Sequence, residues 1–261
     1  MADYESLLYE EQDGIATVTL NRPDKHNSFS PTQINEIESL WKSLRFNDDV
    51  RCVIVTGAGD KAFSTGIDLT FTYPQPTSRL MIDDPMARIG PKTNDLWKPV
   101  IAAVNGMACG GAFYLLGEVE FIIASESATF FDPHVTHGMP CVYEPMFMLQ
   151  RMPIGEIMRL SLLGRHERMT AARAREIGLV QEVVPDADLL EQARWAAGVI
   201  ANSPDPLSIE VTVKAIWTAQ YMAFHQALQN APTLVNLVDG TTAVPERADR
   251  LRHQKIEPRL R

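Results

Sequence analysis

The chain begins with short segments in which the spacing of apolar residues changes from a strand pattern to a helical one. Residues 7–11 and 15–20 flank Asp13-Gly14, a pair that favours a tight turn, so they predict the two strands of a hairpin. Residues 30–44 begin with Ser-Pro, which is typical of a helix N-terminus, and their apolar positions recur at helical spacing. A hairpin followed by an amphipathic helix is therefore expected.

Almost uniformly apolar runs farther along the chain predict strands that are buried on both faces. Their alternation with helical segments indicates an α/β protein with parallel strands and right-handed crossovers. The predicted strands are residues 50–56, 100–104, 121–125, 128–131 and 180–184. The predicted helices are part of 78–97, then 143–152, 155–163, 170–177, 188–202, 207–229 and 246–255, with a change of character near 203–206.

Composition limits the classes of function. The 261 residues are 45% hydrophobic and 22% charged, as in an ordinary globular protein, and the formal net charge of −9 argues against nucleic acid or an anionic membrane as the main partner. The three cysteines have no paired spacing, so no disulfide framework is expected. No apolar run approaches the ~20 residues that span a bilayer, and no signal region is evident. We therefore expect a cytoplasmic protein without membrane insertion.

Two glycine-containing segments are the main candidates for chemistry. In residues 98–116, a predicted strand and the Asn105-Gly106 turn lead to Gly110-Gly111, where a helix begins. Adjacent glycines at a helix start leave backbone N–H groups open to an oxygen that acquires negative charge. Close packing of the helix against the strand would also explain them. The second segment, residues 62–69, holds a glycine between two β-branched residues, followed by an acid.

Two other motifs have simpler interpretations. Residues 57–62 match a glycine-rich dinucleotide pattern, but no helix follows at once, so a tight loop is expected. His134 and His137 follow Asp132 and suggest a metal site. The residues between the histidines favour extended structure, which points the two rings to opposite faces, and no third or fourth ligand at a credible spacing is evident. We therefore expect no metal.

The order and separation of several motifs resemble the enoyl-CoA hydratase/isomerase (crotonase) family over nearly the whole chain. These motifs are residues 20–23 (Leu-Asn-Arg-Pro), 62–69, 99–106 with Gly110-Gly111, 163–164 (Leu-Gly) and 171–180. The resemblance implies a crotonase spiral of ββα units over residues 1–203 and a helical oligomerisation region over 204–261. It also implies a homo-oligomer, either trimer or hexamer, and an acyl-CoA thioester ligand. Coenzyme A would be part of the substrate, with no separate cofactor.

The resemblance also implies roles for residues of the two glycine-containing segments. The thioester carbonyl oxygen would accept hydrogen bonds from the backbone N–H groups of Ile67 and Gly111, which form an oxyanion hole. Asp68 is implied to lie along the ligand and could equally be a structural cap. The residues implied to bind substrate are Gly66, Asp68, Leu69 and Gly110.

The chain departs from the family at both catalytic glutamates of a typical hydratase. Tyr114 stands three residues after the oxyanion glycine, and His134 stands at the second position, after Pro133. Hydration by two carboxylates is therefore not supported, and His134, with an unperturbed pKa of about 6.5, remains as a single base. Glu144 either orients the imidazole or acts as acid or base itself. Tyr114 either donates a hydrogen bond or fills the pocket.

These features lead to one expected function and two alternatives. We expect an acyl-CoA-processing isomerase or lyase of fatty-acid metabolism that holds a thioester enolate in the oxyanion hole and uses a single base. The first alternative is hydrolytic C–C cleavage of a β-diketone by His134 and a supporting acid. The second, from another class, is a non-catalytic acyl-CoA-binding protein that kept the hole and lost both glutamates.

Overall fold

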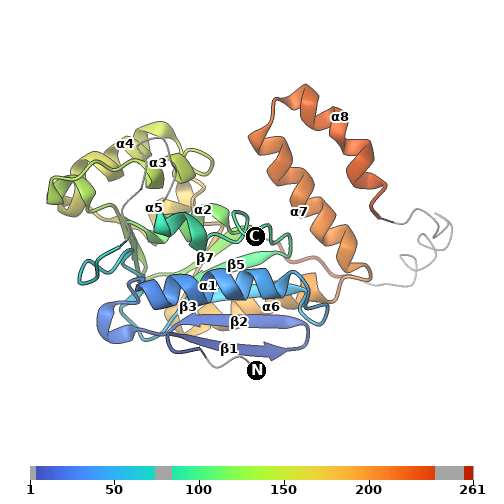
Figure 1. Cartoon of the computed structure of the whole chain (residues 1–261), viewed down its shortest axis with the longest axis horizontal. Coiled ribbons are helices and arrows are strands. Elements are labelled where there is room, and N and C mark those ends of the chain that lie inside the picture. The colour runs from blue at the N-terminus through green and yellow to red at the C-terminus, as the bar shows by residue number, and fades with distance from the viewer. Residues whose placement is uncertain (1–3, 74–83, 239–255, 261) are drawn as a thin grey trace. The chain divides into compact units, whose positions relative to one another are not determined.

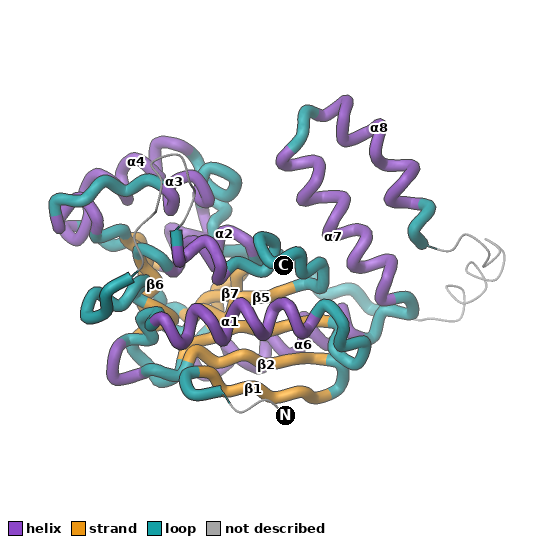
Figure 2. Tube along the Cα trace, viewed as in Figure 1, coloured by secondary structure: helices purple, strands orange, loops and turns teal. Residues whose placement is uncertain are grey.

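Two β-sheets lie at the centre of the larger of two units in the chain. The computed structural model describes residues 4–73, 84–238 and 256–260 (Figure 1), and the chain divides into the units Met1–Val213 and Lys214–Arg261. Strands and helices alternate through the first unit (Figure 2), which confirms the α/β class. None of the described helices is long and apolar enough to cross a membrane.

The larger sheet of the described chain starts from the predicted hairpin. Strands β1 (Leu7–Gln12) and β2 (Ile15–Leu20) are antiparallel and join at Asp13-Gly14, where both residues have positive φ. The other strands are parallel, in the order β1-β2-β3-β5-β7-β10. They are β3 (Cys52–Gly57), β5 (Val100–Val104), β7 (Phe121–Ser125) and β10 (Glu182–Val184).

Helices cover both faces of this sheet, which explains the uniformly apolar strands. Ile54 and Ile101 point to one face and pack against α6 (Leu189–Ala201). The residues that alternate with them enter a larger core with α1 (Pro31–Leu44) and α2 (Ala112–Glu118). A strand that is buried on both faces needs apolar residues at every position, so it shows no alternation in the sequence.

A smaller sheet runs beside the larger one and was only partly predicted. Its strands are β4 (Ala62–Ser64), β6 (Met107–Cys109), β8 (Thr129–Phe131) and β9 (Met169–Thr170). The first three are parallel, and β9 is antiparallel to β8. The strand β8 was predicted, within residues 128–131, whereas β4, β6 and β9 were not. Segments of two or three residues are in general too short to show a period.

The chain winds between the two sheets in a repeating path. Strands β3, β5 and β7 of the larger sheet are each followed by one strand of the smaller sheet, namely β4, β6 and β8. Helix α2 follows β6 and returns the chain to the larger sheet. This path is the spiral of β-β-α units that sequence analysis expected.

Most of the other helices lie where they were predicted. They are α3 (Tyr143–Met148), α4 (Ile154–Leu163) and α5 (Ala171–Glu176), whose N-cap Thr170 accepts a hydrogen bond from the backbone N–H of Arg173. The single helix predicted over 207–229 is wrong. The structure has α7 (Pro206–Tyr221) and α8 (Phe224–Val235), because the backbone is extended at Ala223. The helix predicted over 246–255 lies outside the described residues.

Two predictions near the glycine-containing segments are also corrected. In place of a helix within 78–97, the described residues form only the short 3₁₀ helix Pro85–Ile89, and residues 74–83 lie outside the description. His134–His137 form a 3₁₀ helix and are not extended. The physical reason is local, since a carboxylate oxygen of Asp132 accepts the backbone N–H of His134 at 2.9 Å and so starts a turn.

Candidate active site

The carboxyl ends of three parallel strands of the smaller sheet bring the predicted site residues together. Ile67 comes three residues after β4, Gly110 and Gly111 follow β6 directly, and Asp132 and His134 follow β8. Strands β4 and β8 both pair with β6 in parallel register, so these three chain segments leave the sheet at the same edge. That edge is where open parallel sheets commonly bind ligands.

The backbone N–H groups of Ile67 and Gly111 lie close together at this edge. A Cβ atom on Gly66, whose φ is +80°, would lie 2.5 Å from the nitrogen of Gly111, so only glycine permits this approach. The Ile67 segment is fixed by two bonds to Phe29, which donates its N–H to the Gly66 carbonyl and accepts the N–H of Asp68. Within the described residues, the N–H groups of Ile67 and Gly111 donate to no acceptor. Both are therefore available to an oxygen atom of a ligand.

Both amides line a cavity of about 410 Å³. This volume suits the reacting end of a small-molecule ligand. Of the other residues that sequence analysis assigned to substrate, Gly66 does not line the cavity and acts through the close approach described above. The cavity is also lined by Asp68, Leu69, Gly110 and His134, and by the basic residues His26, Arg165 and Arg168.

Asp68 fixes the loop that carries Ile67. The Asp68 side chain is buried and forms an ion pair with Arg22 at 2.8 Å, and one of its oxygens accepts the backbone N–H and the hydroxyl of Thr70. Burial alone would raise the pKa of Asp68, but the hydrogen bonds from Thr70 and Arg22 outweigh it and lower that pKa. Asp68 therefore has the geometry of a structural cap. Leu69 is exposed at the cavity wall.

His134 lies beside the two amides and is held by a buried acid. Nδ1 of the imidazole lies 2.8 Å from Oδ1 of Asp132, whose side chain is fully buried, while the His134 side chain is 21% exposed. A Cβ atom on Gly110 would lie 3.8 Å from Cε1 of His134, so the ring is next to the Gly110-Gly111 pair. The hydrogen bond to Asp132 raises the pKa of His134, against the opposing effect of partial burial.

Glu144 lies at the other nitrogen of the same ring. It occupies the first turn of α3, and its Oε1 lies 3.6 Å from Nε2 of His134. That separation is longer than a hydrogen bond, so the lone pair of Nε2 is not committed to Glu144. Burial raises the pKa of Glu144, and the negative charge of Asp132 adds to that rise. The structure thus places one imidazole between two buried carboxyl groups.

Tyr114 lies near Glu144, but its hydroxyl is hydrogen-bonded to Asp84. Its hydroxyl donates a hydrogen bond of 2.7 Å to Oδ2 of Asp84, and its ring packs against Tyr143 and Phe147. Burial raises the pKa of Tyr114, and the negative charge of nearby Glu144 reinforces that shift. Tyr114 is not among the residues that line the cavity. The phenol of Tyr114 therefore lies outside the cavity lining.

Sequence analysis did not recognise Asp132 as the partner of His134. Asp132 entered only a metal interpretation. That interpretation was rejected because the following residues were expected to be extended and no third or fourth ligand at a credible spacing was evident. The available signal was an acid two residues before the histidine, a spacing at which a carboxylate can accept a backbone N–H and begin a turn. In the structure, Asp132 accepts both the backbone N–H and Nδ1–H of His134.

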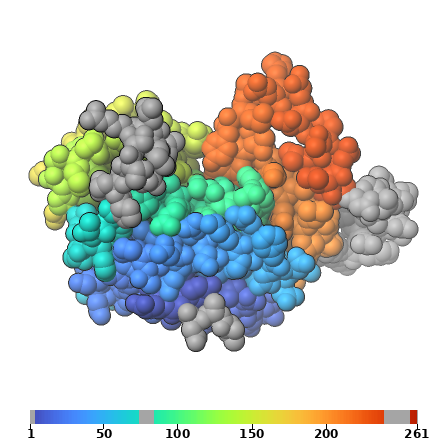
Figure 3. All heavy atoms as spheres, in the orientation of Figure 1, coloured from blue at the N-terminus to red at the C-terminus, as the bar shows by residue number. Residues whose placement is uncertain are grey.

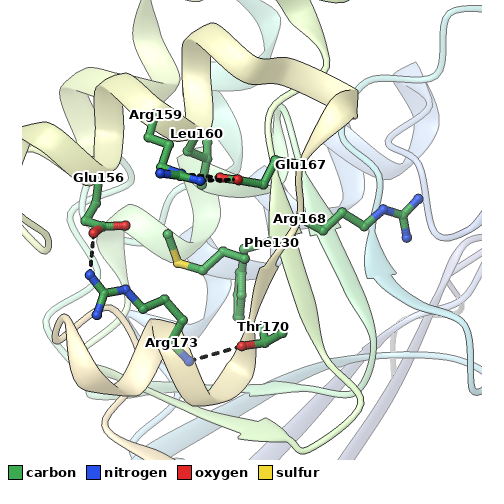
Figure 4. A pocket seen from close by; sticks show the side chains of 9 residues that line it. Phe130, Glu156, Arg159, Leu160, Glu167, Arg168, Thr170 and Arg173 are labelled. Atoms are coloured by element: carbon green, nitrogen blue, oxygen red, sulfur yellow. Dashed lines mark hydrogen bonds and ion pairs between the residues drawn. The ribbon is translucent and has the colours of Figure 1, made fainter.

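A second cavity, of about 320 Å³, is lined by residues of α4, β9 and α5 (Figure 4). Arg159 donates two hydrogen bonds to Glu167, and Arg173 pairs with Glu156 at 2.5 Å. Figure 4 shows Arg168 pointing away from the cavity. Because the other two guanidinium groups are neutralised by carboxylates, this second cavity is a poor site for an anionic ligand. The cavity at the two amides is the better candidate.

Comparison with known proteins points to one family. A family model described as enoyl-CoA hydratase/isomerase matches residues 10–235. The (E)-benzylidenesuccinyl-CoA hydratase of Thauera aromatica is 34% identical over 213 residues, which cover 80% of this chain and 81% of that protein. A carnitinyl-CoA dehydratase of Escherichia coli is 31% identical over 264 residues, which cover 94% of this chain and 97% of the relative.

Solved structures agree with this assignment. An enoyl-CoA hydratase/isomerase from Mycobacterium paratuberculosis has a TM-score of 0.87 and 34% identity, and the match covers 97% of this chain and 98% of that one. An enoyl-CoA hydratase from Bacillus anthracis has a TM-score of 0.82 and 28% identity, covering 95% and 96% of the two chains. The expected crotonase fold is thereby confirmed. The chain belongs to the enoyl-CoA hydratase/isomerase (crotonase) family of acyl-CoA-processing enzymes.

Proposed function

We propose that this enzyme binds an acyl-CoA thioester at the two amides and transfers a proton at a carbon near the thioester carbonyl. One observation carries the proposal: the unpaired N–H groups of Ile67 and Gly111 line the same cavity as the imidazole of His134. Removal of a proton next to a thioester places negative charge on the carbonyl oxygen. Each fixed N–H donor then contributes about 3–4 kcal/mol to the stabilisation of that charge.

His134 is the base in this proposal. Because the carboxylate of Asp132 accepts a hydrogen bond at Nδ1, that nitrogen carries the proton and Nε2 keeps its lone pair. Nε2 removes the substrate proton, and the imidazolium that forms is stabilised by Asp132 on one side and by Glu144 on the other. The raised pKa of His134 fits a base that holds the proton through the enolate stage.

A single base favours isomerisation, or another reaction in which one proton leaves and returns. In isomerisation, His134 removes a proton from one carbon, the double bond shifts as the enolate forms, and the same proton is returned at another carbon. Coenzyme A takes part only as the activating group of the substrate. Relatives named as a hydratase and a dehydratase of acyl-CoA compounds support an enoyl-CoA or a hydroxyacyl-CoA as the substrate class.

Turnover of a panel of enoyl-CoA and β-ketoacyl-CoA thioesters tests the proposal. We expect His134→Ala to lower kcat by about 10²- to 10⁴-fold, which is the usual contribution of a positioned base. We expect a smaller loss for Glu144→Gln, because the amide keeps the shape of the side chain and removes only its charge. Wild-type rates in both variants would refute these roles. Thermal stabilisation of the wild type by acyl-CoA without any product would instead show a non-catalytic acyl-CoA-binding protein.

The pairing of Asp132 with His134 also favours a second candidate, hydrolytic C–C cleavage of a β-diketone. In that reaction Nε2 of His134 removes a proton from water, and the hydroxide adds to one carbonyl carbon. The two amides then hold the tetrahedral oxyanion until the C–C bond breaks and the carbon leaving group is protonated. Reaction in ¹⁸O-labelled water distinguishes the candidates. Hydrolysis places one labelled oxygen in the carboxylate product, whereas isomerisation places none.

We also propose that the chain forms a homo-oligomer, either trimer or hexamer, through residues 204–261, while residues 1–203 form the catalytic core. Helix α8 carries an apolar stripe of Phe224, Leu228 and Val235, which are 69%, 52% and 66% exposed. The surface of α8 is drawn in orange-red in Figure 3. An exposed stripe at helical spacing is typical of a surface that another chain covers.

A further inference from the structure

Cys141 completes a set of metal-binding side chains around the imidazole of His134. One ligand atom from each of four residues lies within 4.8 Å of the others, and we call this set the His134 cluster. Its members are Asp132, His134, Cys141 and Glu144. They come from the end of β8, the 3₁₀ helix that follows it and the start of α3. The proposed function uses Asp132, His134 and Glu144, and it leaves Cys141 without a role.

The donor atoms of His134, Glu144 and Cys141 lie at, or slightly beyond, the spacing of neighbouring ligands in a tetrahedral metal site. Nε2 of His134 lies 3.6 Å from Oε1 of Glu144, and Sγ of Cys141 lies 3.9 Å from Oε2 of Glu144. Zinc–nitrogen, zinc–oxygen and zinc–sulfur bonds of about 2.0–2.3 Å place neighbouring ligand atoms of a tetrahedron about 3.3–3.6 Å apart. Small rotations of these side chains are therefore enough to bring their donor atoms to bonding distance from one central ion.

An unsatisfied buried oxygen provides independent support. Oδ1 of Asp132 accepts two hydrogen bonds from His134, but Oδ2 is fully buried and has no hydrogen-bond partner among the described residues. A buried carboxylate oxygen without a partner is costly, and the positive charge of an ion bound at Nε2, across the ring, partly compensates that cost. A carboxylate at Nδ1 is also the arrangement that orients metal-binding histidines, because it leaves Nε2 facing the ion.

The charge and chemical type of the ligands select the ion. Two buried carboxylates and a thiolate around one neutral imidazole favour a divalent cation. Imidazole nitrogen together with thiolate sulfur suits Zn²⁺, whereas Mg²⁺ and Ca²⁺ prefer sites made only of oxygen. The cluster therefore favours zinc over the common hard cations.

We propose that Nε2 of His134, the carboxylate of Glu144 and the thiolate of Cys141 bind one Zn²⁺ ion while Asp132 holds the ring at Nδ1, and that the ion inhibits the enzyme. Binding displaces the proton of the Cys141 thiol to solvent and occupies the lone pair of Nε2 in His134. The ion binds whether or not the proposed function is correct. The inhibition rests on the proposed function, because it follows from the loss of the base.

Cobalt titration of the full chain tests the binding, because Co²⁺ accepts the same tetrahedral ligands and reports a thiolate by a charge-transfer band in the near ultraviolet. We expect this band at micromolar Co²⁺, and we expect Zn²⁺ to remove it by displacement. Cys141→Ser should abolish the band. Cys109→Ser is the matched control. Cys109 lines the same cavity as His134 but lies outside the cluster, so this variant should keep the band.

Asp132→Asn provides a second test, the affinity for Co²⁺, which can be used even if Cys141→Ser does not fold. We expect this variant to lose about 10- to 100-fold in affinity for Co²⁺, the usual effect of removing a partner that orients a ligating histidine. No thiolate band in the folded wild type, or a band that persists in Cys141→Ser, would overturn the zinc site. A normal band in a protein that turns over no acyl-CoA would support the zinc site and count only against the proposed function. Turnover that Zn²⁺ does not reduce at saturating occupancy would overturn the inhibition.

Discussion

Replacement of Gly66 by alanine is the sharpest test of the two-amide site. The added Cβ would start 2.5 Å from the nitrogen of Gly111, and such contacts are essentially never shorter than 3.0 Å. The difference, 3.0 − 2.5 = 0.5 Å, is therefore the least by which the Ile67 and Gly111 segments must separate. In addition, φ is +80° at this position, and a left-handed conformation costs alanine about 1–2 kcal/mol.

In the proposed function, this displacement acts directly on the two N–H donors that stabilise the enolate. Catalytic groups must lie within about 0.5 Å of their productive positions, so a shift of that size removes most of the benefit of one donor. Loss of one oxyanion-hole donor typically lowers kcat by about 10²- to 10³-fold. We expect Gly66→Ala to lower kcat by at least about 100-fold and to change KM much less, because the donor matters most when charge has developed.

The matched control is Gly14→Ala in the β1–β2 turn. Gly14 has φ of +77°, nearly the same as Gly66, but a Cβ atom there would meet nothing closer than 3.6 Å. Both variants should lose similar stability from backbone strain in thermal unfolding, with a further loss in Gly66→Ala from the clash. Only Gly66→Ala should lose activity in steady-state kinetics. If kcat of a folded Gly66→Ala protein stays within about threefold of the control, the amides do not form an oxyanion hole.

Three further predictions test the surroundings of the site. Tyr114→Phe removes the hydrogen bond to Asp84, so the free energy of unfolding in urea should fall by about 1–2 kcal/mol while kcat changes by less than about threefold; a much larger loss of kcat would make the phenol a catalytic group. Asp68→Asn should destabilise the protein by about 1–3 kcal/mol at neutral pH. Because folding lowers the pKa of Asp68, the stability that it contributes is fully present above its unfolded value of about 3.9 and is lost as the pH falls through the folded pKa. Urea unfolding should therefore show a larger deficit at pH 7 than at pH 3. Leu228→Asp places a charge in the exposed stripe of α8, and light scattering should show a smaller assembly than the wild type if that stripe is the subunit contact.

The sequence was most informative where the determining interactions are local. Asp13-Gly14 predicted the hairpin because both residues tolerate positive φ, and Ser30 predicted the start of α1, where its side chain accepts the backbone N–H of Gln33. Gly110-Gly111 predicted a helix start with open amides, and Gly111 is the N-cap of α2. In each case one or two adjacent residues determine the backbone, so a single sequence is sufficient.

The sequence was least informative where distant segments determine the structure. Strands β4 and β6 have three residues each, and they are strands because β6 pairs with β4 on one side and with β8 on the other in the smaller sheet. The orientation of His134 depends on a turn that Asp132 starts, and its approach to Glu144 depends on the position of α3. Contacts between distant segments leave no periodic pattern of residues in the sequence. The break between α7 and α8 at Ala223 likewise has no glycine or proline beside it to mark it.

The candidate site has two parts, the backbone N–H donors and the side chains that would move protons. They have different physical origins, so the chain can keep the N–H donors while the side chains differ from those of a typical hydratase. The proposed oxyanion donors, the N–H groups of Ile67 and Gly111, are backbone groups, which the register of β4 with β6 and the positive φ of Gly66 hold in place. They do not depend on the side chains at positions 114 and 134. A substitution at either position can therefore change how protons move while the thioester carbonyl keeps its two donors. For the same reason, binding of acyl-CoA alone cannot identify the reaction, whereas variants of His134 and Glu144 can.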